Sequence, residues 1–521
     1  MKKFFILFFI FFTSYLSAQT FNKRFVKDAW ATKFKSCLII NDTLFVSGIY
    51  GLKNAAQNQK HSICQFNLEG NLISQHYFMG DSSRDYSELR SLFLSKSNKL
   101  IGVGYAGENG AQKYGTICII NKNLSNDTLI KYTDLNRFSF PFVDIVETGI
   151  DEFIIAGFSS KSGIGAATIN KIKTSGELIW SKYLNLNSYI FPTSLTLKSN
   201  GRLILQSGSE VYFPNETNPS KVSTWNVIHE IDTATGNTLK FKKSVNDSIS
   251  GSVALIPTPY NSFIIGGFKI DSVKEFDGNY LKGYLAKLDS NYNSVWEKRV
   301  ASSSGNSYFN NIKKLADGNY LAVGECMNFD FDTTIPYSNP LKGMYAGWMV
   351  KFTEQGDILW DRKHYGVASY LEFNRLFDFV ELPNGDIIAV GESTNMYNDD
   401  NFTQDSITQM GWLLRVNANG CLSPTDCGYT SIANSAEKKL NIAIYPNPIA
   451  NQLYIETQAL VPNQSYTLLL SDIHGKAVSR SIPLLANSSI TVDVSDYIAG
   501  TYIVTVYSEE KPILSKRIIK Q

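Results

Sequence analysis

Acidic side chains gather in three stretches that join short apolar runs. Pairs of carboxylates are the usual basis of glycoside hydrolysis, and clusters of them bind calcium. The three groups are Asp81, Asp85 and Glu88; Asp330 and Asp332; and Asp399, Asp400 and Asp405. Solvated loop charge is the default interpretation of these groups, with a calcium site or a catalytic pair as alternatives.

Other catalytic chemistry has no recognisable pattern in this sequence. The five histidines are dispersed and form no spaced pair, and there is no HExxH, GxSxG, phosphate-binding glycine loop or EF-hand loop. Metal ligation normally needs closely spaced ligands. We therefore predict no catalytic, cofactor-binding or metal-binding residues and no enzymatic activity. The histidines are His61, His76, His229, His364 and His474.

Six cysteines allow one easy disulfide. Cys421 and Cys427 flank LSPTD, where a turn could bring them together. Cys37 and Cys64 fall on the first and third strands of one expected unit, roughly 9–10 Å apart, which exceeds the ~7 Å Cα limit for a bridge. We predict a Cys421–Cys427 disulfide and buried free thiols at the other four positions.

These residues lie within a repeat. A polar or glycine turn residue starts a short apolar strand that ends at a small residue six positions later, as in GNYLAVG (318–324). The anchors, meaning the small residues that end each copy, are 50 to 67 residues apart. The seven copies are 42–48, 98–104, 151–157, 201–207, 261–267, 318–324 and 385–391.

Each repeat resolves into four strands and no helix, most clearly at 309–315, 319–324, 347–352 and 357–363. Short strands without covering helices bury their faces only by stacking radially around an axis. We predict an all-β fold with a seven-bladed β-propeller at 19–427. The seventh repeat lacks a fourth strand, and FNKRFV (21–26) resembles one, so the chain ends should pair and close the ring.

Recurring aromatic residues have two interpretations. Trp180, Trp296 and Trp360 recur in fourth strands and Trp225, Trp348 and Trp412 in third strands, which favours packing between blades over a ligand cage. The variable connections, notably 209–224, 268–282, 325–346 and 392–410, should share one face with the strand-four connections. This face is a candidate binding surface, although the filling of gaps between blades is the default interpretation of its aromatics. They are Tyr86, Phe138, Tyr189, Tyr308 and Tyr370.

The beginning of the chain indicates export. Lys2 and Lys3 precede an apolar run at 4–12 and a small-residue site at Ser17-Ala18, typical of a signal peptide at 1–18. No later stretch reaches the ~20 apolar residues of a transmembrane helix. A net charge of +2 gives no field that would favour nucleic acid.

A polar linker at 428–440 precedes a second domain at 441–521. Seven short alternating runs fall at 442–445, 452–456, 466–471, 476–481, 490–494, 500–507 and 513–520, which predicts an immunoglobulin-like antiparallel β-sandwich.

The motifs of this second domain are specific. YPNP (445–448), LSDIHGK (470–476), VDVSDYIAGTYIV (492–504) and the basic end KRIIK (516–520) resemble the type A C-terminal sorting domain of the type 9 secretion system of Bacteroidetes. The repeats are similar to uncharacterised exported propellers. The motif residues are Tyr445, Pro446, Asn447, Pro448, Gly475, Gly500, Tyr502 and Lys516; we expect Gly500 to make a tight turn and the basic end to be solvated.

The resemblance implies a route of export. The chain would cross the inner membrane, be recognised by the outer-membrane translocon, lose the domain to a sortase, and be released or held at the cell surface. We predict a non-enzymatic binding or adhesion module for a glycan or protein ligand. The alternatives are a glycan-active enzyme with acidic residues on the loop face and a ligand-free scaffold, because fold alone cannot choose among them.

Overall fold

The computed structural model consists of β-strands with one 3-10 turn, η1 (Pro259–Asn261), among the residues it describes. The chain divides into two compact units, 1–433 and 434–521. Within the described parts, no helix is long and apolar enough to span a membrane. The described residues are 20–25, 29–52, 59–78, 85–108, 114–132, 141–161, 164–184, 189–212, 222–243, 250–274, 278–300, 306–328, 344–366, 372–395, 408–423, 441–458, 466–472, 477–479, 481–485, 488–508 and 511–521.

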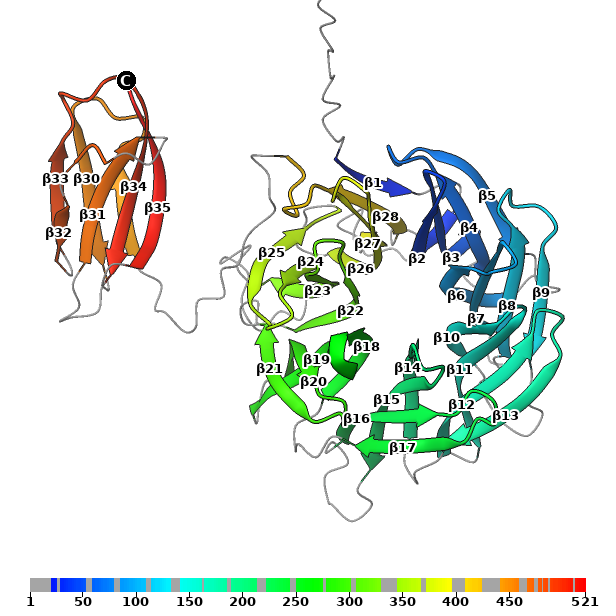
Figure 1. Ribbon diagram of the computed structural model, residues 1–521. Helices are drawn as coiled ribbons and strands as arrows, with labels where there is room; N and C mark the ends of the chain where they lie inside the picture. The colour runs from blue at the N-terminus through cyan, green and yellow to red at the C-terminus, as the bar shows by residue number, and fades with distance from the viewer. Residues whose placement is uncertain are drawn as a thin grey trace, which may run out of the picture. The chain divides into compact units, whose positions relative to one another are not determined.

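The described strands of the first unit form seven four-stranded antiparallel blades around a ring (Figure 1). From the innermost strand outward, the blades are β2-β3-β4-β5, β6-β7-β8-β9, β10-β11-β12-β13, β14-β15-β16-β17, β18-β19-β20-β21, β22-β23-β24-β25 and β26-β27-β28-β1. This confirms the predicted all-β propeller.

The strands of the first four blades are β2 (Ala29–Ile40), β3 (Thr43–Leu52), β4 (Gln59–Phe66), β5 (Leu72–Phe78), β6 (Asp85–Leu94), β7 (Lys99–Glu108), β8 (Tyr114–Asn121), β9 (Thr128–Tyr132), β10 (Phe142–Gly149), β11 (Glu152–Lys161), β12 (Ile164–Lys173), β13 (Leu178–Leu184), β14 (Tyr189–Leu197), β15 (Leu203–Tyr212), β16 (Val222–Ile231) and β17 (Thr238–Lys243). Those of the last three are β18 (Ser250–Thr258), β19 (Ser262–Lys274), β20 (Gly278–Leu288), β21 (Ser294–Val300), β22 (Ser307–Lys314), β23 (Tyr320–Asn328), β24 (Met344–Phe352), β25 (Ile358–His364), β26 (Glu372–Glu381), β27 (Ile387–Asn395), β28 (Thr408–Val416) and β1 (Phe21–Phe25).

The two ends of the ring are joined as the sequence predicts. Strand β1 is the outermost strand of the last blade and pairs antiparallel with β28, from Phe21 opposite Arg415 to Phe25 opposite Gly411. Trp412 Nε1 donates a hydrogen bond to Asn22 Oδ1 at 2.7 Å. This pairing covers the edge of β28 that would otherwise be open.

Backbone geometry explains which residue types begin and end each copy of the sequence repeat. The residue that starts each copy, from Asp42 to Gly385, has a φ of +56° to +88°, a left-handed turn that Gly, Asn and Asp tolerate best. The anchor pairs with the inner strand directly before a β-bulge. A Cβ at Gly48 or Gly391 would lie 1.8 Å from a carbonyl oxygen of that strand, so the anchor must be small.

Five of the six tryptophans pack between blades, as predicted, and the side chain of the sixth, Trp225, is outside the description. The Trp348 ring stacks on Phe309 at 4.4 Å and contacts Gly283 of the preceding blade, and Trp412 contacts Gly347 in the same way. In the fourth strands, each of three tryptophans covers a left-handed glycine in a turn of the next blade. The pairs are Trp180 with Gly236, Trp296 with Gly356, and Trp360 with Gly420.

Four buried cysteines form no disulfide, namely Cys37, Cys64, Cys118 and Cys326. Cys37 and Cys64 lie on opposite sides of Val46 in a three-strand row, as expected. Cys421 is disulfide-bonded, and its predicted partner Cys427 lies outside the described residues.

Two expectations about the loops are wrong. The segment 268–282 is mostly a hairpin rather than a loop, because β19 and β20 stay paired out to Lys274 and Gly278. Strands also extend into the other expected variable connections, since β15 continues to Tyr212 and β23 to Asn328. Alternating polar residues continue these strand pairs beyond the apolar run on which the prediction rested.

The second unit is an antiparallel sandwich of two sheets, β29-β30-β33 and β32-β31-β34-β35. Its core is aliphatic and includes Leu453, Ile455, Leu468 and Val504. The strands are β29 (Asn441–Tyr445), β30 (Gln452–Gln458), β31 (Tyr466–Asp472), β32 (Ile482–Leu484), β33 (Ser489–Asp493), β34 (Gly500–Ser508) and β35 (Lys511–Lys520).

The sandwich departs from the sequence prediction in three places. The fourth strand lies at 482–484, not 476–481, because the backbone N–H of Val478 turns back to Leu470 O. Gly500 opens β34 without a left-handed φ, and a Cβ there would lie 3.9 Å from Ile498 O, an ordinary contact, so no tight turn requires glycine there. The basic end is solvated at Lys516 and Arg517, as expected, but Lys520 is buried.

Candidate functional site: the central channel

A β-bulge interrupts the innermost strand of every blade at the same level. In each case one residue of the inner strand has no partner on the second strand, directly after the residue that faces the anchor. A bulge adds one residue to a strand and redirects its side chains. The seven unpaired residues are Lys35, Arg90, Val143, Thr193, Val253, Asn310 and Phe377.

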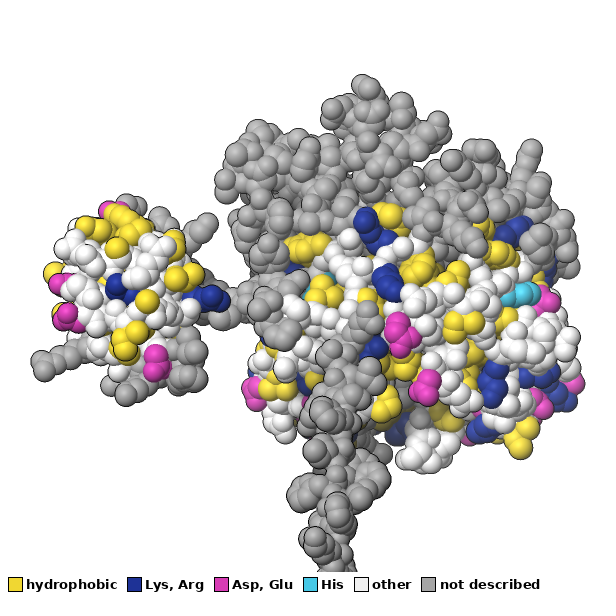
Figure 2. Space-filling model, turned by 90° about the horizontal axis from the view of Figure 1, so that it is seen from above, with side chains coloured by type: hydrophobic (Ala, Val, Ile, Leu, Met, Phe, Trp, Pro, Cys, Tyr) yellow, Lys and Arg dark blue, Asp and Glu magenta, His cyan; other side chains and the backbone are white. Residues whose placement is uncertain are grey.

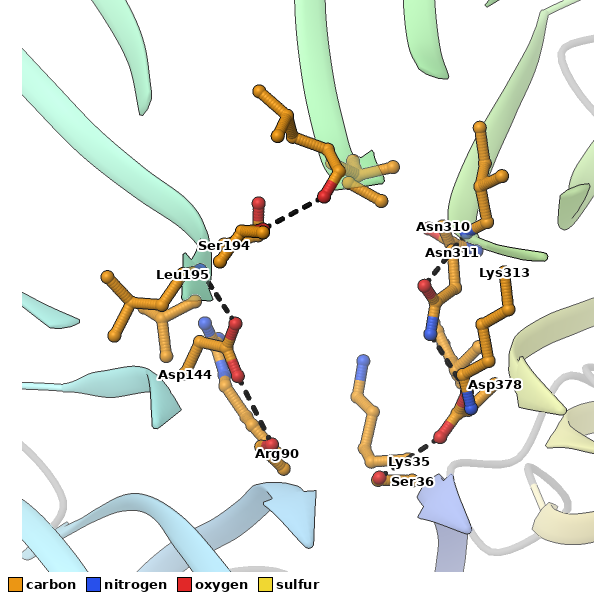
Figure 3. A pocket seen from close by; sticks show the side chains of 18 of the residues that line it. Lys35, Ser36, Arg90, Asp144, Ser194, Leu195, Asn310, Asn311, Lys313 and Asp378 are labelled. Carbon is orange, nitrogen blue, oxygen red and sulfur yellow. Dashed lines mark hydrogen bonds and ion pairs between the residues drawn. The ribbon is translucent and has the colours of Figure 1, made fainter. Parts of the chain in front are cut away.

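These strands enclose a cavity of about 470 Å³ on the ring axis (Figure 3). All seven inner strands contribute to its lining, and small-molecule sites commonly occupy ~300–1,000 Å³. The cavity wall is mixed. Val143 and Val253 are apolar, while Lys35, Arg90 and Asn310 bring polar groups.

The residues that follow the bulges join the blades to one another. Asp378 accepts hydrogen bonds from Ser36 Oγ at 3.0 Å and from Asn311 Nδ2 at 2.8 Å. Its carboxylate also lies 2.6 Å from Lys313 Nζ. Three blades therefore meet at one buried carboxylate, and its bonding capacity is largely used within the ring.

Asp144 has a similar role on the other side of the channel. It accepts hydrogen bonds from Ser91 Oγ at 3.3 Å and from the backbone N–H of Leu195 at 2.8 Å, which belong to the two neighbouring blades. Burial raises the pKa of Asp144 to about 6, although these hydrogen bonds oppose the shift. This carboxyl group therefore changes charge near neutral pH.

An ionic cluster lies beside the cavity across four blades. Glu88 contacts Lys35 at 3.5 Å, Arg90 at 3.4 Å and Lys33 at 3.9 Å. Lys33 also lies 3.9 Å from Glu392, which is bound by Arg375. Arg375 in turn lies 2.6 Å from Glu325, so the cluster contains four cations and three carboxylates: Lys33, Lys35, Arg90 and Arg375 with Glu88, Glu325 and Glu392.

Burial and charge act in opposite directions in this cluster. Burial disfavours ionisation of Glu88, but Lys35, Lys33 and Arg90 outweigh it and lower the pKa of Glu88 to about 2. Burial lowers the pKa of Lys35 to about 7, and the attraction of Glu88 offsets only part of this effect. The ammonium group of Lys35 is therefore partly deprotonated near neutral pH.

The sequence-predicted aromatic face is only partly visible. Tyr308, in β22, lies against Glu325, and burial and this carboxylate raise its pKa. Tyr86, Tyr189 and Tyr308 lie in strands β6, β14 and β22 rather than in connections, which corrects their expected position. The side chains of Tyr86 and Tyr189 are outside the description. Phe138 and Tyr370 lie outside the described residues.

Of the acidic residues that the sequence analysis grouped together, the structure describes only Asp85 and Glu88. Glu88 is buried in the ionic cluster and is not a solvated loop charge. Asp85 begins strand β6. Asp81, Asp330, Asp332, Asp399, Asp400 and Asp405 lie outside the described residues. The described part of the chain contains no group of three or more metal-ligating side chains.

The channel residues escaped the sequence prediction, although a signal exists. A polar residue stands thirteen positions before the anchor in five blades, as Asp378 does before Gly391, and twelve before it in the first, where Ser36 precedes Gly48. Ala254 is the exception. Because the bulge shifts the inner strand by one residue, ordinary alternation does not assign these side chains to the channel.

In the second unit, the motif residues join its two sheets. Asn447 accepts a hydrogen bond from Ile519 N at 2.8 Å and donates one to Arg517 O at 3.1 Å. Lys516 Nζ donates to Ile444 O at 2.7 Å. Tyr445 stacks on Tyr454, its bond to Pro446 is cis, as is that between Asn447 and Pro448, and Tyr502 donates to Ile498 O at 2.7 Å. Gly475 lies outside the described residues.

Comparisons with known proteins bear on the two units differently. Residues 443–521 match the family model of the secretion system C-terminal sorting domain. No curated protein matches the chain.

Several solved structures resemble the chain at low identity. An ulvan lyase of a polysaccharide lyase family is 9% identical, with a TM-score of 0.48, over 75% of this chain and 94% of that one. The alpha-L-arabinanase of Penicillium chrysogenum is 10% identical, with a TM-score of 0.39, over 58% and 93%. A protein of unknown function from Dyadobacter fermentans is 10% identical, with a TM-score of 0.39, over 64% and 96%. These similarities assign no activity to this chain.

Proposed function

Since the C-terminal unit is a type 9 secretion C-terminal sorting domain, which indicates export to the cell surface or secretion, we propose that the chain is an exported binding protein. The propeller is the cargo. It recognises a ligand at its central channel and the adjoining loop face, and it does not convert the ligand chemically. The sorting domain engages the outer-membrane translocon and is removed by the sortase.

The observation that carries this proposal is the cavity together with the state of its carboxylates. A rigid ring of seven strands encloses about 470 Å³. Asp144 and Asp378 are engaged in bonds that join the blades. Groups that hold the ring together support a preformed site, whereas a general acid or base needs freedom to exchange a proton with the ligand.

The alternative is a glycoside hydrolase with paired carboxylates. Glu88 and Glu392 both lie 3.9 Å from Lys33 Nζ, so their carboxylates are within about 8 Å of each other, a separation that fits such pairs. Their environment favours structure over catalysis. The pKa of Glu88 is lowered to about 2, so it holds no proton to donate near neutral pH, and both side chains are buried against cations.

The experiment is an array of glycans and host-matrix proteins probed with the full chain, with and without calcium. We expect specific binding of one ligand class, no shortened or unsaturated product by chromatography, and no requirement for calcium. A variant with residues 330–342 replaced by a Gly-Ser linker tests the loop face. Product formation at a rate above that of buffer, or binding of nothing above background, would overturn the proposal.

A further inference from the structure

Two of the seven unpaired bulge residues are cations, and they lie on adjacent blades. Lys35 of β2 and Arg90 of β6 line the cavity at the same level. In Figure 3 the side chain of Lys35 rises into the space between the wall of Asp144 and the wall of Asn311. One side of the channel is therefore cationic, while the bulge positions of the other five blades are neutral.

The carboxylate beside these cations is shared among three partners. Glu88 carries one negative charge and lies within 3.9 Å of Lys33, Lys35 and Arg90. Arg90 Nε is buried and has no hydrogen-bond partner within the described residues, although Glu88 lies 3.4 Å away. The three cations around Glu88 outnumber its single negative charge, which favours a further anion beside them.

Two carboxylates lie in the rest of the wall, Asp144 and Asp378, and both accept hydrogen bonds from neighbouring blades. Asp378 is held by Lys313 and by the blades around it, and Asn310 donates its amide to Leu376 O at 2.9 Å. The ring of Phe377 lies 3.5 Å from Lys35 Nζ, measured to its centroid. Phe377 therefore makes a cation–π contact that positions the Lys35 ammonium, and the ring also lines the cavity.

We propose that the channel binds an oxyanion of the ligand, a carboxylate or a sulfate ester, between Lys35 and Arg90, with Phe377 against the adjoining part of the ligand. This inference rests on the proposed function and specifies the chemistry of the same site. Uronic acids and sulfated sugars both present such a group, and the experiment below separates these two sources.

Binding should depend on pH through two groups. Lys35, whose pKa is about 7 and whose charged neighbours are Lys33, Glu88, Arg90 and Glu392, takes up a proton when the oxyanion binds. Asp144, which faces Ser91, the N–H groups of Ile145 and Leu195, and the charge of Asp378, becomes negative above a pKa of about 6. Both changes weaken anion binding as the pH rises from 6 to 8.

The test measures binding of D-glucuronate, glucose 6-sulfate and glucose to the full chain by calorimetry. We expect glucuronate or the sulfate ester to bind at least ten times more tightly than glucose at pH 6. Affinity should fall about tenfold by pH 8, since the ammonium fraction of a group with a pKa near 7 falls from about 90% to 10%. Whichever probe binds more tightly identifies the source of the oxyanion.

Variants separate the two cations. Lys35→Gln should reduce affinity about tenfold at pH 6 and weaken its pH dependence. Arg90→Gln should reduce affinity and retain a pH dependence, with the midpoint shifted upward because the charge of Arg90 lowers the pKa of Lys35. The control is Lys287→Gln. Lys287 is not among the channel residues and pairs with Glu354 at 2.8 Å, so its removal should change neither the affinity nor its pH dependence.

A direct readout does not depend on the folding of any variant. Lysines of the unmodified sequence are dimethylated with ¹³C, and their titration is followed by NMR with and without glucuronate. One lysine should titrate near pH 7 and shift upward on binding. Equal binding of glucose and both anions, or no such lysine, would overturn the inference. An array ligand whose binding is unchanged by Lys35→Gln and Arg90→Gln would do the same while leaving the proposed binding function intact.

Discussion

Replacing the anchor Gly324 by alanine should destabilise the propeller, although the change adds a single methyl group. A Cβ at this position would lie 2.1 Å from Tyr308 O and 2.7 Å from Phe309 Cα. Both are backbone atoms of the inner strand β22, so no side-chain rotation relieves the contact. The strand would have to move together with its bulge at Asn310, which lines the channel.

The magnitude follows from the nature of the contact. Adding methyl groups to a well-packed core typically costs about 1–3 kcal/mol when side chains can adjust. Because only backbone can move here, we expect the upper end, about 3 kcal/mol. With an unfolding entropy of about 2.1 cal/mol/K per residue over roughly 400 residues, this loss lowers Tm by about 4 °C.

Differential scanning calorimetry of three variants tests the reasoning. Gly208→Ala is the matched control, because a Cβ there meets nothing within 4 Å and the backbone is not left-handed. It should be neutral or slightly stabilising. Gly318→Ala, with open space and a φ of +88°, isolates backbone strain at about 1–2 kcal/mol. If Gly324→Ala melts at the temperature of Gly208→Ala, the steric account of the anchor is wrong.

The other predictions concern ring closure, one buried carboxylate and pH. Deleting residues 20–25 removes β1 and the acceptor of Trp412 Nε1 and should cost about 3 kcal/mol or more. Deletion of residues 401–406 is the control, and equal Tm values for the two deletions would contradict closure of the ring by β1. Asp378→Ala leaves the Ser36 hydroxyl and the Asn311 amide without their acceptor and Lys313 without its partner at 2.6 Å, so it should cost about 3–5 kcal/mol in urea denaturation. Asp317→Ala, whose exposed carboxylate pairs with Lys351, is the control and should cost at most about 1 kcal/mol; similar losses would refute the prediction. Burial lowers the pKa of His61 to about 3, so the stability that this residue contributes is present above pH 6.5 and is lost as the pH falls. Its share of the loss between pH 8 and pH 5 should be about 2 kcal/mol and should be absent in His61→Gln. If stability depends on pH equally in the variant and the unchanged protein, this prediction is wrong.

The sequence predicts features that depend on short stretches of chain. The left-handed turn at Asn98 or Gly318 and the small anchor six residues later are local requirements, so seven copies of them reveal seven blades. The pairing of β1 with β28 was predictable for the same reason, because the stretch 21–26 resembles a fourth strand. On the face of the propeller unit seen in Figure 2, basic, acidic and hydrophobic side chains are interspersed, in keeping with a net charge of +2.

The candidate site was less predictable because its parts come from distant repeats. Ser36 and Asp378 are 342 residues apart in sequence and hydrogen-bonded in the ring. Glu88 belongs to an acidic group that the sequence indicates as loop charge, yet three cations from two blades surround it. No local pattern pairs these residues across blades, since they come from three inner strands, β2, β6 and β26, that are distant in sequence and meet only around the axis.

The sequence by itself therefore determined the repeat, the closure of the ring and the C-terminal sorting domain, because turns, alternation and motifs are written in neighbouring residues. Only the tertiary structure decided what lines the channel and in which charge state. A bulge of one residue turns Lys35 and Arg90 toward the axis, and burial then sets the pKa of Lys35 near 7. Both effects arise from the packing of seven strands around one cavity, which no single repeat contains.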